Sequence, residues 1–214
     1  TLYGERQGKF RVLDALSTLA FHYPKRSAYF TQELEQFLLL SREQHRSPLL
    51  YTGSYAGAMG QPQFMPSSYR RFATTFSGGK QVDLMHDTDA VIASVAHYFQ
   101  KHGWQAYQDV TQPAQVRGYG IRRIDTNLKT AQYSIEHLRR FGVAPQTRVS
   151  NTPGTAGVVA LETAKGSEYW IAYPNFYVIT RYNSSPLYAM AVYLFAKQLG
   201  ETRLAQTNPR YAYG

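Results

Sequence analysis

A glycine-rich stretch holds the side chains best suited to ligand chemistry. Residues 53–66 read Gly-Ser-Tyr-Ala-Gly-Ala-Met-Gly-Gln-Pro-Gln-Phe-Met-Pro, so Ser54 and Gln63 stand among glycines and alanines. Small residues let the backbone approach a ligand closely, while a hydroxyl and an amide supply hydrogen bonds. A buried structural turn would have a similar glycine content, so composition alone leaves both interpretations open.

A second segment adds aromatic rings near the end of the chain. Tyr182, Asn183 and Tyr188 lie at a predicted strand-to-helix junction, which is a common position for the wall of a site. Tyrosine joins a flat apolar face to a polar tip, and this combination suits stacking on sugars or bases. An asparagine turn beside two packed tyrosines is the alternative interpretation.

The remaining pattern predicts the elements that must position these side chains. Ser94 and Tyr98 lie one helical turn apart, and a core helix is the favoured interpretation of their segment. Apolar spacing predicts helices over residues 11–20, 27–44, 67–76, 89–102, 130–141 and 187–199. Short β-branched and aromatic runs predict strands over residues 158–161, 169–172 and 176–180. The predicted fold class is therefore α+β, mainly α, with a small antiparallel β insertion near the C-terminus.

The composition bounds the class of protein. A chain of 214 residues, 43% of them hydrophobic, suits one globular unit with or without a small appended subdomain. The absence of cysteine excludes disulfides, thiolate metal sites and thiol catalysis in this chain. The net charge of +9 favours anionic partners, but the basic residues are scattered in pairs, as on a solvated surface. We expect no nucleic-acid partner, because no recognition motif accompanies the charge.

Three motifs together resemble those of the membrane-bound lytic transglycosylase B family. They are Gly-Ser-Tyr-Ala-Gly-Ala-Met-Gly-x-x-Gln-Phe-Met-Pro-Ser-Ser-Tyr, Ser-Val-Ala-x-Tyr-Phe and Tyr-Asn-x-Ser-x-x-Tyr-Ala-Met. The segments 11–16 and 20–26 also match, and the resemblance runs in order from Thr1 to about Ala196. It implies a lysozyme-like core that cleaves peptidoglycan between N-acetylmuramic acid and N-acetylglucosamine and leaves 1,6-anhydromuramyl ends. It also implies one glutamate that acts first as acid and then as base, which requires a carboxyl kept neutral by apolar surroundings.

The resemblance assigns roles to several side chains. Ser54 and Gln63 would line the site, with Gln63 holding the substrate's acetamido group or the catalytic carboxyl. Tyr98, Tyr182 and Tyr188 would form walls that stack on sugars and keep the glutamate dry.

Further roles concern the ends of the substrate and the reacting group. Asn183 would hydrogen-bond a sugar, and Lys25 and Arg26 would face lactate or peptide carboxylates. The family's catalytic glutamate stands directly before a Thr-x-[Trp/Tyr]-Gly segment, which Thr1–Gly4 matches. We therefore expect no catalytic residue within this chain, with the glutamate immediately before Thr1 in a longer enzyme.

No other carboxylate is a good substitute for that glutamate. Glu5 follows the matched glycine and would point elsewhere. Glu33, Glu35 and Glu43 are interpreted as exposed charges on a helix. A non-catalytic peptidoglycan-binding scaffold is therefore the alternative function.

The resemblance also bears on metal, domains and location. Thr75 and Gly79 stand where a calcium loop of this family has aspartates, and Lys80 adds a repelling charge, so we expect no metal and no cofactor. We expect a catalytic core over residues 1–200, with a β subdomain at about 145–182, and a polar tail over 201–214. The expected location is the periplasm, with outer-membrane attachment only through an upstream lipid anchor. The expected partners are peptidoglycan glycan strands and other cell-wall enzymes.

Overall fold

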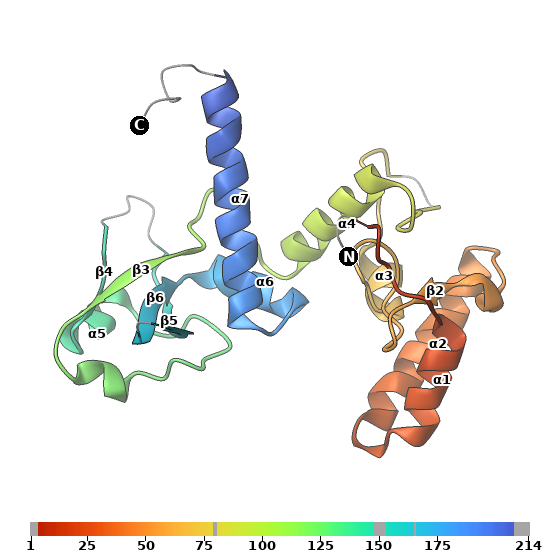
Figure 1. Ribbon diagram of the computed structural model, residues 1–214, viewed down its shortest axis with the longest axis horizontal. Helices are drawn as coiled ribbons and strands as arrows, with labels where there is room; N and C mark the ends of the chain where they lie inside the picture. Colours follow the sequence, from red (N-terminus) through yellow and green to blue (C-terminus); the bar gives the residue numbers. More distant parts are fainter. Residues whose placement is uncertain (1–3, 79–80, 148–152, 165, 208–214) are drawn as a thin grey trace. The chain divides into compact units, whose positions relative to one another are not determined.

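The computed structural model describes residues 4–78, 81–147, 153–164 and 166–207, with side chains described as far as Arg203. The chain divides after Tyr98 into two compact units (Figure 1). No helix in the described part of the chain is long and apolar enough to cross a bilayer.

The first unit is helical. Its elements are β1 (Phe10–Arg11), α1 (Val12–His22), the 3-10 turn η1 (Pro24–Arg26), α2 (Ser27–Glu43), the 3-10 turn η2 (Pro48–Leu50), β2 (Thr52–Gly53), α3 (Pro66–Phe72) and α4 (Thr88–Lys101). Helix α1 packs against α2, and both also approach η2. The predicted helices over 11–20, 27–44 and 89–102 are confirmed, and Asp87 accepts a hydrogen bond from the Ala90 N–H at the start of α4 (3.0 Å).

Helix α3 ends four residues earlier than predicted. Ala73 is already extended, and the chain then binds α4 through Ser94. The Ser94 hydroxyl accepts from the Thr74 N–H (2.9 Å) and lies 3.1 Å from the Thr74 carbonyl oxygen and 2.6 Å from that of Ala90. Ser94 is fully buried and therefore belongs to the structural contacts of the unit, as the core-helix interpretation of its segment implies.

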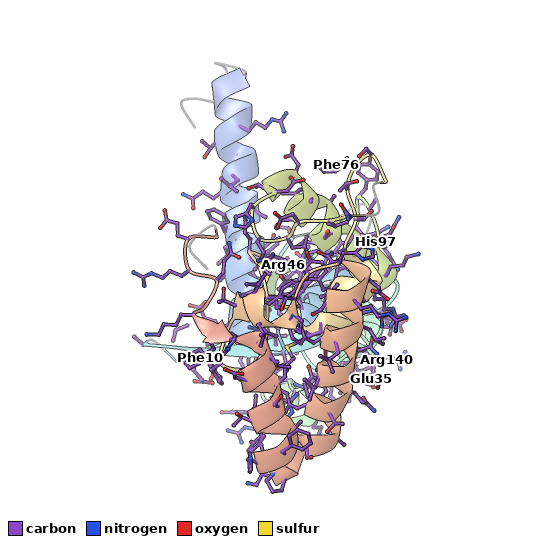
Figure 2. All side chains as sticks on the ribbon, turned by 90° about the vertical axis from the view of Figure 1, so that its right-hand side faces the viewer. Phe10, Glu35, Arg46, Phe76, His97 and Arg140 are labelled. Carbon is purple, nitrogen blue, oxygen red and sulfur yellow. The ribbon has the colours of Figure 1, made fainter. Side chains whose placement is uncertain are left out.

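The prediction that Glu33 is an exposed charge is wrong. Only 4% of this residue is exposed, and its carboxylate accepts the Ser67 N–H (2.9 Å) and the Ser67 hydroxyl (2.6 Å) at the start of α3. A carboxylate at a helix N-terminus satisfies a backbone N–H that has no partner inside the helix. Glu35 is exposed as predicted, on the outer side of α2 (Figure 2), and Glu43 is exposed and pairs with Arg70.

The second unit is a four-stranded antiparallel sheet with helices. Its elements are β3 (Thr111–Val116), the 3-10 turn η3 (Gly120–Arg123), α5 (Ile135–Arg140), β4 (Val143–Pro145), β5 (Gly157–Thr163), β6 (Gly166–Ala172), α6 (Pro174–Tyr182) and α7 (Pro186–Thr207). The strand order is β4-β3-β6-β5 (Figure 1). The prediction of a small antiparallel sheet in a mainly helical α+β fold is confirmed. The strands over 158–161 and 169–172 are also confirmed.

Both faces of this sheet carry a hydrophobic cluster. Val158 and Ile171 belong to one cluster, which also contains Leu138 of α5. Their sequence neighbours Val159 and Ala172 belong to the other cluster, which includes residues of α6 and α7. Successive residues of a strand point to opposite faces, so these apolar runs lack the alternation of a half-exposed strand.

Three predicted elements of this unit need correction. Residues 176–180 are helical within α6 and do not form a strand. The prediction was wrong because the run 176–179 is buried and contains no polar residue that would reveal a helical period. The helix predicted over 130–141 is confined to α5, and α7 continues through Gly200 to Thr207. Strand β3 was not predicted, because Thr-Gln-Pro-Ala-Gln-Val is polar and contains proline. The division into a core over 1–200 and a tail over 201–214 stays a prediction.

A buried asparagine holds the loop that precedes the sheet. The Asn175 side chain accepts from the Gln105 N–H (2.8 Å) and donates to the carbonyl oxygens of Gln105 (2.9 Å) and Gln108 (3.0 Å). These three bonds satisfy the buried Asn175 side chain at the start of α6.

Removing the Glu33 carboxylate should destabilise the first unit. Glu33→Ala leaves the Ser67 N–H and hydroxyl without their acceptor in a buried place, so we expect a loss of about 2 to 3 kcal/mol. Glu33→Gln, which keeps one acceptor oxygen, should lose less. Urea unfolding measures both, with Glu35→Ala on the same helix as control. Equal effects of Glu33→Ala and Glu35→Ala would contradict the capping role.

Tyr177 should make stability fall at alkaline pH. Burial, helped by nearby Asp125, raises the pKa of its hydroxyl from 10.0 to about 12. Below pH 10 the tyrosine is protonated in both states, whereas between pH 10 and 12 only the unfolded state ionises, so stability is lost over this window. Tyr177→Phe removes a buried hydroxyl that has no hydrogen-bond partner within the described residues, so at pH 9 it should unfold at the same denaturant concentration as the parent or a higher one. Its stability should fall less than that of the parent between pH 9 and 11. Parallel falls for both proteins would refute this origin of the pH dependence.

Candidate active site

The segment before α1 docks on the glycine-rich loop through backbone contact. Gly8 has φ +99°, and a Cβ placed there would lie 2.1 Å from the Gly53 carbonyl oxygen. Strands β1 and β2 continue this contact, with Phe10 opposite Gly53. Glycine is therefore required at position 8 both by the backbone conformation and by the close approach.

The glycine-rich loop closes on itself around Ser54. The Ser54 N–H donates to the Ala58 carbonyl (2.8 Å), and its hydroxyl oxygen accepts from the N–H groups of Ala56 (3.2 Å) and Ala58 (3.0 Å). Met59 and Phe64 exchange two further backbone bonds (2.8 and 3.0 Å). A serine hydroxyl that accepts from the backbone keeps its own proton to donate to a ligand.

The loop glycines are explained by protein contacts. A Cβ at Gly57 would lie 2.4 Å from a Leu16 methyl carbon of α1, and one at Gly60 would lie 2.5 Å from the Leu84 carbonyl oxygen. The interpretation as a buried structural turn therefore accounts for these positions, and Ser54 and Gln63 are the side chains that this turn presents.

Gln63 joins the loop to the docked segment. Its amide nitrogen donates to the carbonyl oxygens of Gln7 (2.9 Å) and Gly60 (2.9 Å), so both of its N–H groups are used within the protein. Its backbone is left-handed, with φ +53°. The amide oxygen is thus the end of Gln63 that can meet a substrate N–H or a protonated carboxyl.

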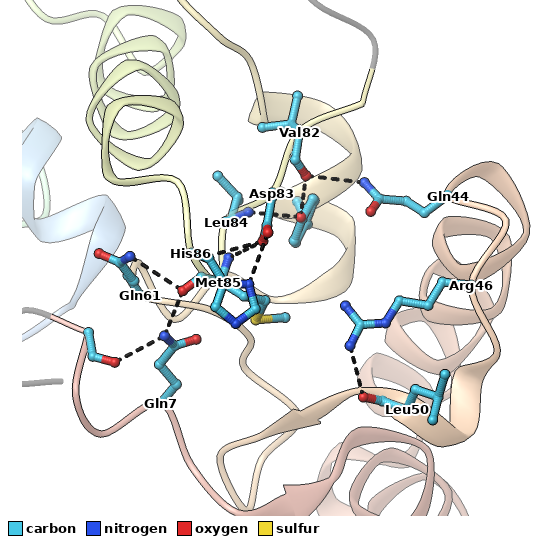
Figure 3. Close-up of polar contacts among 12 residues, drawn as sticks. Gln7, Gln44, Arg46, Leu50, Gln61, Val82, Asp83, Leu84, Met85 and His86 are labelled. Atoms are coloured by element: carbon cyan, nitrogen blue, oxygen red, sulfur yellow. Dashed lines mark hydrogen bonds and ion pairs between the residues drawn. The ribbon is translucent and has the colours of Figure 1, made fainter.

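Gln7 is a second anchor, to which no pattern in the sequence points. Its amide nitrogen donates to the carbonyl oxygens of Met85 (2.8 Å) and Gly4 (3.0 Å), and Gln61 also donates to the Met85 carbonyl (3.3 Å) (Figure 3). The partners Gln7 and Met85 are 78 residues apart, so only the fold brings them together.

The turn that presents the Met85 carbonyl is organised by Asp83. Its carboxylate accepts from the N–H groups of Met85 (2.8 Å) and His86 (3.2 Å) and contacts the His86 ring nitrogen Nδ1 (2.9 Å) (Figure 3). Burial alone would raise the pKa of Asp83, but the hydrogen bonds from His86 and from the two N–H groups outweigh it and lower that pKa.

A hollow of about 290 Å³ lies beside the docked segment. Gly4, Gln7 and Met85 line it on one side, and Arg46 and Tyr51 on the other. The Arg46 guanidinium lies 4.7 Å from the Tyr51 ring centroid and donates to the Leu50 carbonyl (3.2 Å). The surroundings of the docked segment are therefore polar and partly basic.

Tyr98 packs beneath the same loop. Only 8% of it is exposed, and its ring lies 5.7 Å from that of Phe64 and 4.9 Å, edge to face, from that of Phe72. Because Phe64 follows Gln63 directly, the first unit brings Ser54, Gln63 and Tyr98 together around one loop.

The predicted basic pair lies on the η1 turn. Lys25 and Arg26 are both exposed, and the Arg26 guanidinium lies 4.3 Å from the Tyr29 ring centroid and 5.1 Å from that of Phe30. Stacking on these rings limits the freedom of the arginine. Among the described contacts, none joins Lys25 or Arg26 to the glycine-rich loop.

The second unit brings Tyr182, Asn183 and Tyr188 together where α6 passes into α7. The two tyrosine rings are parallel within 2°, with centroids 6.4 Å apart, and burial raises the pKa of Tyr188. The Asn183 amide oxygen accepts from the Ser185 N–H (3.1 Å), and the residue is exposed, so its amide nitrogen can donate to a ligand. Ser185 caps the start of α7, where its hydroxyl oxygen accepts from the Tyr188 N–H (3.3 Å).

Two predictions cannot be followed into the structure. The position expected for the glutamate, before Thr1, lies outside the described residues, as do Gly79 and Lys80 of the loop expected to lack calcium. Within the described residues no group of three or more His, Asp or Glu side chains is placed to hold a metal ion. The absence of calcium therefore stays a prediction.

Known proteins resemble this chain over nearly its whole length. The family model described as Transglycosylase SLT domain matches residues 1–197. The chain is 46% identical to the membrane-bound lytic murein transglycosylase B of Escherichia coli, over 94% of this chain and 53% of that protein.

Solved structures agree in fold. The catenated lytic transglycosylase SltB1 of Pseudomonas aeruginosa superposes with a TM-score of 0.87 at 43% identity, over 95% of this chain and 66% of that one. SltB3 of the same organism, solved in complex with NAG-NAM-pentapeptide, superposes with a TM-score of 0.76 at 25% identity, over 89% of this chain and 51% of that one.

The chain belongs to the SLT transglycosylase domain family. The resemblance to lytic transglycosylase B and the expectation of a lysozyme-like core are both confirmed. The chain spans about half the length of the Escherichia coli relative that it matches.

Gln63→Leu should loosen the docked segment selectively. It removes two N–H donors from the carbonyl oxygens of Gln7 and Gly60, at a cost of about 1 to 2 kcal/mol. Hydrogen exchange should quicken in a peptide covering residues 4–11 more than in one covering α2. Gln32→Leu, an exposed change on α2, serves as control. Unchanged exchange in residues 4–11 would show that Gln63 does not hold this segment.

Proposed function

We propose that the protein is a peptidoglycan lytic transglycosylase that cleaves between N-acetylmuramic acid and N-acetylglucosamine. The observation that carries the proposal is the docking of residues 4–11 on the loop that presents Ser54 and Gln63. Three residues, 1–3, separate that segment from the expected glutamate, and in this proposal the glutamate lies near the same loop. Membership in the SLT family and the names of the relatives support the reaction type.

The reaction needs one carboxyl and no water. The glutamate gives its proton to the oxygen that leaves with N-acetylglucosamine, and the bond from that oxygen to the anomeric carbon breaks. The carboxylate then takes the proton of the muramyl 6-hydroxyl, whose oxygen bonds the anomeric carbon. The proton lost in the first step is regained in the second, and the product is a 1,6-anhydro end.

Gln7 and Gln63 act as positioning residues in this proposal. The Gln7 amide nitrogen donates to the Met85 carbonyl oxygen, and the Gln63 amide nitrogen donates to the Gln7 carbonyl oxygen, so both hold the docked segment. A misplacement of about 1 Å at a reacting group can cost a hundredfold in rate, so these bonds bear on turnover. The Gln63 amide oxygen remains to accept from the acetamido N–H or from the protonated carboxyl, and the Ser54 hydroxyl remains to donate.

The aromatic and polar residues of the predicted site contact substrate in this proposal. Tyr182 and Tyr188 stack on sugars, and Asn183 donates to a sugar oxygen. Tyr98, which is only 8% exposed, excludes water from beneath the loop and has no open face for the stacking that the resemblance implied. Lys25 and Arg26 face lactate or peptide carboxylates; SltB3, a relative, has been solved with a bound pentapeptide-bearing sugar. These residue roles extend the family resemblance position by position.

The setting of the whole protein is likewise proposed. The Escherichia coli relative is named as membrane-bound and acts on murein. We place the present protein in the periplasm, acting on glycan strands, with outer-membrane attachment through an upstream lipid anchor and with other cell-wall enzymes as partners. The core over residues 1–200 supplies the catalytic domain.

A digest of purified sacculi tests the reaction. The protein extended to include a glutamate before Thr1 should release muropeptides with anhydromuramyl ends, each lighter by one water than an ordinary reducing end. Replacing that glutamate by glutamine should abolish release, because the amide cannot exchange the proton. Mass spectrometry reads both products. Reducing ends would show that water is the acceptor, and binding without cleavage would favour a peptidoglycan-binding scaffold.

A further inference from the structure

A basic hollow lies in the second unit, and none of the residues assigned to the reaction lines it. It measures about 540 Å³ and is lined by Arg117, Tyr119, Gly120, Arg123, Arg139, Arg140, Phe141 and Gly142. These residues come from the turn after β3, which contains η3, and from the end of α5, which lie at the same end of the sheet (Figure 1).

Close backbone packing fixes the walls of the basic hollow. A Cβ at Gly120 would lie 2.2 Å from the Phe141 carbonyl oxygen, and one at Gly142, with φ +76°, would lie 2.1 Å from that of Arg117. The Arg117 N–H also donates to the Gly142 carbonyl (2.8 Å). The two segments that bear the arginines are therefore held together by backbone contacts, so their arrangement does not depend on a bound ligand.

The charge of the hollow is poorly compensated. Residues 117–140 contain six Lys and Arg but only two Asp and Glu. Arg140 pairs with Glu136 (2.6 Å), whereas Arg117, Arg123 and Arg139 form no ion pair with any carboxylate in the described parts of the chain. Like charges around one hollow repel, and a bound anion relieves this repulsion.

We infer that the basic hollow binds carboxylates of a short peptide, namely the stem peptides of peptidoglycan. Arginine forks match the two oxygens of a carboxylate. The volume is that of a small-ligand site, roughly 300 to 1,000 Å³, and not that of a long groove for duplex nucleic acid. Tyr119 is 80% exposed, and its ring centroid lies 5.1 Å from the Arg122 guanidinium carbon. It adds an aromatic surface to the hollow. The choice of stem peptides rests on the proposed function.

The test measures binding of the chain to sacculi with and without stem peptides. One sample keeps its peptides, and the other is treated with an amidase that leaves bare glycan strands. Arg123→Gln/Arg139→Gln should bind peptide-bearing sacculi about five- to tenfold more weakly than the parent at low salt. It should bind bare strands equally well. Arg42→Gln/Lys101→Gln removes the same charge from exposed positions elsewhere and should bind both samples like the parent.

Each outcome decides the inference. An equal loss of binding affinity in the two double variants would show a general charge effect. A loss of affinity for bare strands would point to the glycan as the ligand. Either result overturns the inference. The inference would also be overturned if Arg123→Gln/Arg139→Gln lost affinity only for duplex DNA or a phosphate polymer. Binding needs no turnover, so it is read separately from cleavage of bare strands by the glutamate-containing protein. Failure of that cleavage would remove the proposed function and leave the binding result standing.

Discussion

The contact between Gly8 and Gly53 is the constraint on which the candidate site depends. No side chain fits between these two backbones, so the segment before α1 follows the edge of the glycine-rich loop. The β1–β2 pair and the Gln63 bond to Gln7 then reinforce one arrangement from two further directions. The docked segment is thereby held by backbone contacts, which tolerate less movement than contacts between long side chains.

Each unit uses buried polar side chains to fix segments that have little regular structure. In the first unit, Glu33 holds the start of α3, and Ser94 holds the chain that leaves it. In the second, Asn175 binds the loop at Gln105, and Gln112 is hydrogen-bonded to Tyr173 (2.6 Å). Buried groups of this kind cost free energy unless all are satisfied, so they specify one arrangement of the chain.

Much of the fold could be predicted from the sequence, and the failures have a common origin. Helices α1 and α2 have one apolar face and end at clear signals, so local periodicity was sufficient for them. Helix α6 is short, and its run of aromatic and β-branched residues, which the fold buries, resembles a strand in sequence. The resemblance of the motifs pointed to Ser54, Gln63 and Tyr98, which lie around one loop. Gln7 and the role of Glu33 could not be reached, since their partners lie 78 and 34 residues away.

The left-handed backbone of Gln63 has a consequence for the balance between stability and activity. A residue with a Cβ is about 1 to 2 kcal/mol less favourable than glycine in this conformation. Glycine would suit the turn at this position, but it would lack the amide that ties the loop to the docked segment. The local backbone preference and the requirement for a side chain therefore oppose each other at one residue. The cost of the backbone conformation and the gain from the two hydrogen bonds are of similar size, so the glutamine changes the net stability little while it holds the docked segment in place.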